Sequence, residues 1–236
     1  MSIILILTAA LLPAILLLLY TYRQDPQPEP RKLLIKATLQ GVAICIPIAL
    51  AEQLISRILF GPGGTPTTVL GTTMEAFFVA GLVEESGKLF VLWRLLRKNP
   101  YFDEHFDGIV YAVCVGLGFA AIENVFYLVA SGAWVSTAIS RALFSVPGHY
   151  AFAVLMGYYY SMYRFVDHSP RTRAYILLVP IVAHGIFDAI ALSSEVAPPT
   201  LVVISLPVLI WFCIKMHKNA RQKVLAQIQR DKMNQA

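Results

Sequence analysis

Residues 72–93 read TTMEAFFVAGLVEESGKLFVLW, an apolar stretch long enough to cross a bilayer that nevertheless carries two adjacent glutamates, Glu84 and Glu85. Lys88 follows three and four positions later and therefore shares a helical face with both carboxylates. An ionisable side chain near the bilayer centre costs roughly 2.5–3.5 kcal/mol on insertion scales, so a cluster of them is expensive. The stretch predicts a membrane helix that contributes to a polar site inside the membrane.

The composition is typical of a polytopic membrane protein. Of 236 residues, 57% are hydrophobic and 14% are charged, with a mean hydropathy of +0.65. Soluble domains average about 25% charged residues. At roughly 20 apolar residues per span, the sequence predicts an all-α, polytopic transmembrane helix bundle of about seven spans. The predicted spans are residues 3–22, 34–55, 68–93, 108–130, 139–163, 174–193 and 199–216.

The basic residues indicate the orientation of the bundle. Sixteen of the nineteen fall on one side, in three connections and in the segment after the last span. Since basic residues collect on the cytoplasmic side, we expect the N-terminus outside and the C-terminus in the cytoplasm. Residues 1–216 then form the membrane domain and residues 217–236 a polar, basic cytoplasmic tail. This asymmetry explains the net charge of +5, so no nucleic-acid partner is predicted, and the lipid bilayer is the expected contact of the basic loops.

Other predicted spans carry further ionisable side chains. His149 follows Pro147, and a proline inside a helix frees a backbone carbonyl and opens space beside it. His184 and Asp188 are four residues apart and share a helical face. Counting 1.5 Å per residue from the span ends places both histidines, like the glutamate pair, about 15 Å from the nearer membrane boundary. This coincidence of depth predicts a single site near the middle of the membrane.

The predicted span 108–130 adds an acid–amide pair. Small residues recur every four positions from Gly108 to Ala120, a pattern that lets membrane helices approach one another closely. Asn124 continues this stripe and Glu123 lies beside it. Asn124 alone fits a structural hydrogen bond between helices equally well, whereas a lone intramembrane acid such as Glu123 needs a partner.

These side chains contain the parts needed to activate water. A glutamate or a histidine can take the proton of a water molecule, and imidazole or amide donors can stabilise an oxyanion. Alternatively His149 and His184, with Glu123 or Asp188, hold a zinc ion that lowers the pKa of its bound water. Lys88 then keeps one glutamate ionised, because a neighbouring cation favours the charged form. The residues leave both mechanisms open.

At these residues the sequence resembles the PrsW family of intramembrane proteases, which is related to the CAAX prenyl-protease and bacteriocin-immunity superfamily. The resemblance rests on EESGK at 84–88, FDGIVYAVCVGLGFAAIENVFY at 106–127, the span that carries His149, and HGIFDAI at 184–190. The motifs occur in the family's order on four successive spans. Together they are specific, although each alone is weak.

The resemblance implies a peptide hydrolase in the inner, cytoplasmic membrane of a bacterium. Its substrates would be membrane-embedded or membrane-proximal proteins, of which single-span anti-sigma factors are the familiar example. Metal dependence is usually assigned to this family, while the prenyl-protease relatives resemble glutamate-dependent enzymes, so zinc stays open. The predicted catalytic residues are Glu84, Glu85, His149, His184 and Asp188, and the predicted supporting residues are Lys88, Glu123 and Asn124.

Two other readings of the chain compete with this one. The sequence contains no HExxH, GxSxG or GxGD motif, which disfavours the other intramembrane protease mechanisms. The alternative from a different class is a proton- or ion-coupled transporter that uses the intramembrane acids and histidines as a relay. Such transporters usually contain repeated halves, and the sequence shows no internal repeat.

Overall fold

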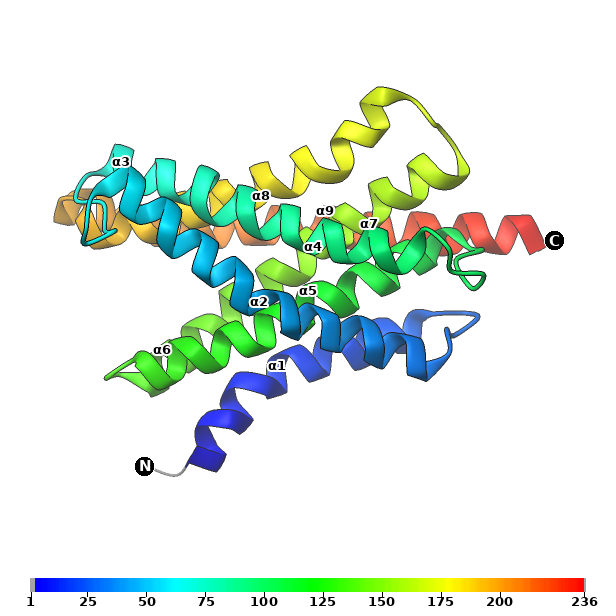
Figure 1. Cartoon of the computed structure of the whole chain (residues 1–236), viewed down its shortest axis with the longest axis horizontal. Helices are drawn as coiled ribbons and strands as arrows, with labels where there is room; N and C mark the ends of the chain where they lie inside the picture. The colour runs from blue at the N-terminus through cyan, green and yellow to red at the C-terminus, as the bar shows by residue number, and fades with distance from the viewer. Residues whose placement is uncertain (1–2, 236) are drawn as a thin grey trace.

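The computed structural model describes residues 3–235, which fold into helices joined by short connections, with no strand among them. The predicted all-α class is confirmed. The N-terminus lies at the end of the bundle occupied by α3 and α6, and the C-terminus lies at the opposite end (Figure 1). The elements are α1 (Ile3–Gln24), α2 (Arg31–Phe60), α3 (Val69–Met74), the π-helix η1 (Glu75–Gly81), α4 (Leu82–Leu96), α5 (His105–Ala130), α6 (Trp134–Ser140), the π-helix η2 (Arg141–Ser145), α7 (Val146–Phe165), α8 (Pro170–Val196) and α9 (Pro199–Gln235).

Five of the helices are long and apolar enough to cross a membrane: α1, α2, α5, α8 and α9. The other two predicted spans, 68–93 and 139–163, also form continuous helical rods, but a π-helix divides each one. The first rod joins α3, η1 and α4, and the second joins α6, η2 and α7. About seven crossings fit these rods at roughly 20 residues per span, and the orientation with the N-terminus outside stays a prediction.

Each π-helix directly precedes predicted site residues. In η2 the Val146 N–H donates to the carbonyl of Arg141, five residues back. Pro147 gives a reason for this wider turn, because its missing N–H removes the α-helical partner of a carbonyl four residues earlier. His149 follows Pro147 by two residues, about half a helical turn. In the first rod, η1 ends three residues before Glu84.

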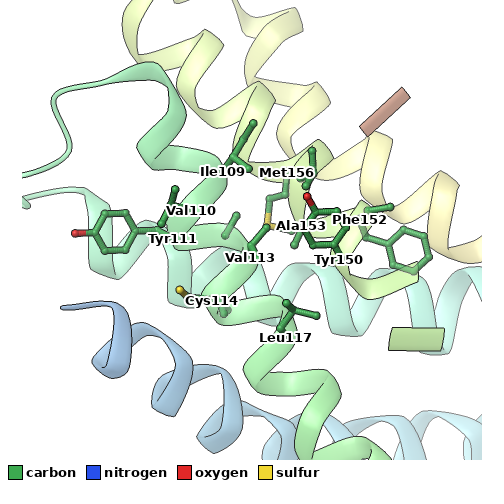
Figure 2. Packing of buried hydrophobic residues seen from close by; sticks show 14 of the residues in the cluster. Ile109, Val110, Tyr111, Val113, Cys114, Leu117, Tyr150, Phe152, Ala153 and Met156 are labelled. Atoms are coloured by element: carbon green, nitrogen blue, oxygen red, sulfur yellow. The ribbon is translucent and has the colours of Figure 1, made fainter. Parts of the chain in front are cut away.

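Helix α5 is the central element of the bundle, and nearly its whole first two thirds is buried. Its apolar side chains pack against those of α7 (Figure 2). A Cβ on Gly157 would overlap with the carbonyl of Gly108 and lie 2.6 Å from Cα of Ile109, so α5 and α7 meet backbone to backbone. A Cβ on Gly118 would likewise overlap with the Thr38 carbonyl of α2. Gly108, which belongs to the predicted stripe of small residues, therefore allows close packing as its spacing predicts, whereas Gly118 lies outside that stripe.

The final helix returns to the start of α5. Asp231 near the end of α9 is buried and accepts hydrogen bonds from the backbone N–H groups of His105 and Phe106, each at 2.8 Å. A carboxylate at a helix N-terminus satisfies free N–H groups and complements the helix dipole. The predicted tail thus continues α9 as a helix as far as Gln235. The division into residues 1–216 and 217–236 stays a prediction, and residues 1, 2 and 236 lie outside the described part.

Candidate active site

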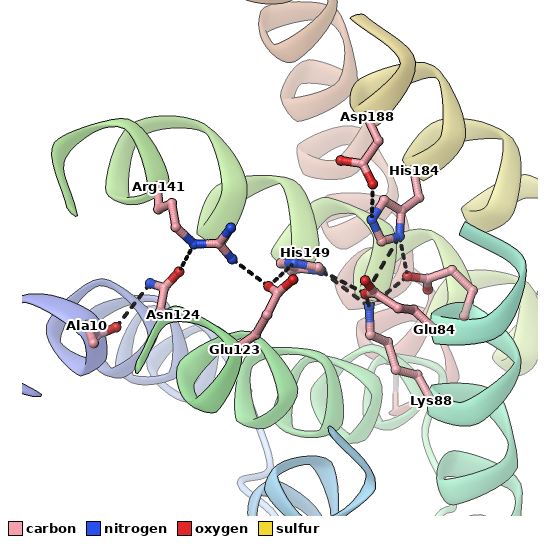
Figure 3. Close-up of polar contacts among 10 residues, drawn as sticks. Ala10, Glu84, Lys88, Glu123, Asn124, Arg141, His149, His184 and Asp188 are labelled. Carbon is pink, nitrogen blue, oxygen red and sulfur yellow. Dashed lines mark hydrogen bonds and ion pairs between the residues drawn. The ribbon is translucent and has the colours of Figure 1, made fainter. Parts of the chain in front are cut away.

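Four predicted site residues from three helical rods lie together and are buried. Figure 3 shows three of them, Glu84, His149 and His184. Glu84 and Glu85 come from α4, His149 from α7 and His184 from α8. Each places one potential ligand atom within 4.8 Å of the others, and all four are at most 4% exposed. Side chains separated by up to a hundred positions in sequence therefore form one buried polar group.

The ammonium group of Lys88 lies inside this group. Its Nζ is 2.8 Å from Oε2 of Glu84, 2.8 Å from Oε1 of Glu85 and 3.2 Å from Nδ1 of His149. The same Nζ lies 4.3 Å from the ring centroid of Phe119. A single buried cation thus faces two buried carboxylates, and their attraction offsets part of the free energy needed to desolvate all three charges.

Each histidine of the group is backed by a second carboxylate. His149 Nε2 lies 3.0 Å from Oε2 of Glu123, and His184 Nε2 lies 3.1 Å from Oδ2 of Asp188. A carboxylate that accepts a hydrogen bond from Nε2–H fixes the tautomer and the orientation of an imidazole ring. Both Nδ1 atoms therefore face the glutamate pair. Since His184 Nδ1 also lies 3.0 Å from Oε1 of Glu85, its two contacts need one proton more than a neutral imidazole carries.

A chain of hydrogen bonds extends from the site to α1. Arg141 Nη2 donates to Glu123 Oε2 at 2.5 Å, and its Nε donates to Asn124 Oδ1 at 2.5 Å. Asn124 Nδ2 in turn donates to the carbonyl of Ala10 at 3.1 Å, and the guanidinium of Arg141 lies 4.0 Å from the ring centroid of Tyr127. Both predicted supporting residues of α5 are therefore in contact with Arg141, which is not among the predicted site residues.

Glu52 of α2 is a second neighbour of the site that is not among the predicted site residues. Its Oε1 is buried with no hydrogen-bond partner among the described residues. Its carboxyl group interacts electrostatically with Glu84, Glu123 and Lys88. An acid within the predicted span 34–55 is itself a signal that points to such a position.

A multi-pass helical bundle that buries two glutamates and two histidines at its centre fits a hydrolase that works inside the membrane. The chain belongs to the PrsW family: the family described as "PrsW family intramembrane metalloprotease" matches residues 29–214. The resemblance given by the motifs is thereby confirmed. No solved structure gives a significant match.

Curated relatives cover most of the chain. A protein named "Protease PrsW" from Geobacillus kaustophilus is 37% identical over 80% of this chain and 81% of its own length. Its namesake from Oceanobacillus iheyensis is 34% identical over 87% and 91%. The one from Bacillus subtilis is 33% identical over 94% and 99%. The chain is therefore an intramembrane protease and a multi-pass protein of the bacterial cell membrane, as predicted.

Proposed function

We propose that the buried group hydrolyses peptide bonds in membrane-embedded or membrane-proximal proteins. The observation that carries the proposal is the convergence of Glu84, Glu85, His149 and His184 to within 4.8 Å of one another at full burial. Paired carboxylates and imidazoles supply proton acceptors and donors, and a water-poor site strengthens their electrostatic interactions with a reacting group. Membership of a protease family supplies the reaction type.

Within this group, Glu85 is our candidate for the general base. Its Oε1 is held by Lys88 and His184, while its Oε2 is fully buried with no donor among the described residues. That oxygen can accept a proton from water as the water oxygen bonds to the substrate carbonyl carbon. His184, which contacts both Glu85 and Asp188, is placed to pass the proton to the amine nitrogen as the C–N bond breaks.

Lys88 has a different proposed task, and His149 is positioned by its neighbours. The ammonium of Lys88 is the positive charge nearest to the glutamate pair, and it can stabilise negative charge that develops on the substrate carbonyl oxygen. Glu123 and Arg141 hold the His149 ring from behind, so they act as positioning residues.

The family description implies a metal, and the donor set fits one. Two imidazole nitrogens and two carboxylate oxygens within 4.8 Å are ligand types that zinc accepts. If a metal is bound, we propose Glu84 and Glu85 as its carboxylate ligands, as an alternative to the direct action of Glu85 as base, because Glu123 and Asp188 contact the histidines on their far nitrogens. Lys88 Nζ contacts three of the four donors, so its ammonium has to move for a metal to bind. A bound metal would polarise a carbonyl and acidify water.

As substrate we propose a membrane-anchored protein, and the single-span anti-sigma factor implied by the resemblance is the first to test. The enzyme would be reconstituted in vesicles with a tagged substrate of this kind. We expect Glu84→Gln, His149→Ala and His184→Ala to slow cleavage by about 100-fold or more. Glu75→Gln, which removes an acid from the same rod but outside the buried group, should cleave like wild type. If all three site variants cleave at the wild-type rate, the proposal is wrong.

A further inference from the structure

A cavity of about 290 Å³ lies between the first turns of α2, the end of α4 and the connection that leads to α5. The start of α2 and the end of α4 lie at the same end of the bundle as the C-terminus (Figure 1). Three basic side chains line it: Lys36 from α2, and Arg94 and Lys98 from the end of α4 and the residues after it. Gln40 and Tyr101 add polar groups to the wall.

The three basic side chains of this cavity form no ion pair with any described residue. Within the part of the chain that the structure describes, no carboxylate forms an ion pair with Lys36, Arg94 or Lys98. Arg94 contacts the Phe90 ring instead, with its guanidinium carbon 5.9 Å from the ring centroid. Unpaired positive charges around one concavity raise the local concentration of anions.

The residues beside the cavity are of the kind found at the membrane–water interface. Trp93 and Tyr101, on either side of the end of α4, are exposed aromatic residues of the kind enriched at the membrane–water interface. Leu33 and Leu95 add an apolar part to the lining. A lining of this kind, charged in one part and apolar in another, matches a phosphate group attached to a hydrocarbon chain.

We propose that this cavity binds a phosphate-bearing anion, supplied in the membrane by the headgroup of an anionic phospholipid. The guanidinium of Arg94 presents a donor fork that fits two phosphate oxygens, and the lysines provide point charges. Basic pockets between membrane helices on the cytoplasmic side are suited to such headgroups. A bound lipid would bridge α2 and α4, the helix that carries Glu84 and Glu85.

The test uses the full-length purified protein and compares two triple variants. Lys36→Gln/Arg94→Gln/Lys98→Gln removes the cavity's charges, and Lys218→Gln/Arg221→Gln/Lys232→Gln removes three exposed charges from α9. Binding of phosphatidylglycerol, phosphatidylcholine and inorganic phosphate is followed by native mass spectrometry and by the thermal unfolding midpoint. We expect phosphatidylglycerol affinity to fall by about 10-fold or more in the cavity variant alone.

Each outcome decides the proposal. If phosphatidylglycerol binds and inorganic phosphate shifts nothing, lipid is the source of the anion, whereas an equal effect of inorganic phosphate assigns a soluble phosphate. Equal losses in both triple variants would show diffuse attraction to lipid and overturn the proposal, as would unchanged binding in the cavity variant. If the cavity triple does not fold, Arg94→Gln alone should weaken phosphatidylglycerol binding about threefold, with Arg221→Gln as its control.

Discussion

Lys88 Nζ lies 2.8 Å from Oε1 of Glu85, in an ion pair whose two side chains are 4% and 0% exposed. The same ammonium bridges to Glu84 at an equal distance. It therefore contacts three of the four side chains that would hold a metal, Glu84, Glu85 and His149. The protein neutralises its buried acids with the ammonium group of Lys88. Variants of Lys88 can therefore distinguish direct activation of water by a glutamate from activation through a metal.

Replacing Lys88 by methionine should destabilise the protein by about 3–5 kcal/mol, because the glutamate pair loses its buried counter-charge. Added zinc should then restore much of the thermal unfolding midpoint, since the metal would take the place of the ammonium among the same donors. The Lys88→Met/Glu84→Gln double variant should regain less, because it lacks a ligand. If zinc raises the midpoint of both variants equally, the proposed ligand set is wrong.

Removal of metal offers a direct comparison for the wild-type enzyme. If the buried group works through a metal, a chelator should abolish cleavage of the tagged substrate and stoichiometric zinc should restore it. If the glutamates act on water directly, cleavage should persist after exhaustive chelation. The thermal unfolding midpoint, measured in the same samples, separates loss of metal from loss of fold.

The contact between Glu123 and His149 predicts a positioning effect. Glu123→Gln should lower kcat by about 10- to 100-fold and leave KM nearly unchanged. The His149 imidazole is still present in this variant, but its tautomer is no longer fixed by a carboxylate. Arg141→Lys should retain more of the wild-type activity than Arg141→Ala, since lysine keeps a positive charge beside the Glu123 carboxylate. Loss of folding in Glu123→Gln, with no separate change in kcat of the folded fraction, would point to a purely structural role.

The contact between α5 and α7 should be sensitive to a single methyl group. Gly157→Ala places a Cβ against the backbone of Gly108 and Ile109, so the helices have to separate. Overpacking of this kind typically costs about 1–3 kcal/mol. Gly132→Ala, at a position where a Cβ would meet no atom within 4 Å, serves as the control. Equal unfolding midpoints for the two variants would contradict the observed packing.

Stability should depend on pH through Glu29, which lies between α1 and α2 and accepts a hydrogen bond from Tyr111 at 2.5 Å. Burial raises the pKa of Glu29 from 4.5 to about 7, outweighing that hydrogen bond, and Asp25 and Asp103 nearby raise it further. Asp107 also contacts this carboxyl group. The contribution of Glu29 to the free energy of unfolding is therefore complete below about pH 4.5 and is lost as the pH rises through about 7.

Glu29→Gln removes this titration and should flatten the pH dependence. Between about pH 5 and pH 8 the wild-type unfolding midpoint should fall more steeply than that of the variant, since each pKa unit corresponds to about 1.4 kcal/mol. Asp167→Asn, at an exposed acid in the connection before α8, is the matched control. Parallel curves for wild type and Glu29→Gln would contradict the assignment.

The sequence predicts the local part of the site well. The spacing of Glu84, Glu85 and Lys88 places them on one helical face, and the structure shows both ion pairs. Depth counting indicates that His149 and His184 join them, because the rise per residue of a membrane helix is nearly constant.

Other features depend on how the helices are rotated and packed, which residue spacing does not encode. The electrostatic interactions of Glu52 with the site and the hydrogen bonds of Arg141 to Glu123 and Asn124 depend on which faces of α2 and η2 are turned toward the site. The π-helices arise from a change in hydrogen-bond register. The polar composition after residue 216 indicates the end of a span, yet α9 continues, because Asp231 caps α5.

The most direct test of the account is the single-turnover cleavage rate of a tagged single-span substrate by Glu85→Gln enzyme in vesicles. Glutamine nearly preserves the shape of the side chain but cannot accept a proton from water. We expect a rate at least about 100-fold below wild type, with Glu75→Gln cleaving normally and both variants unfolding near the wild-type temperature. A Glu85→Gln rate within about threefold of wild type would contradict the assignment of Glu85 as the base that activates water.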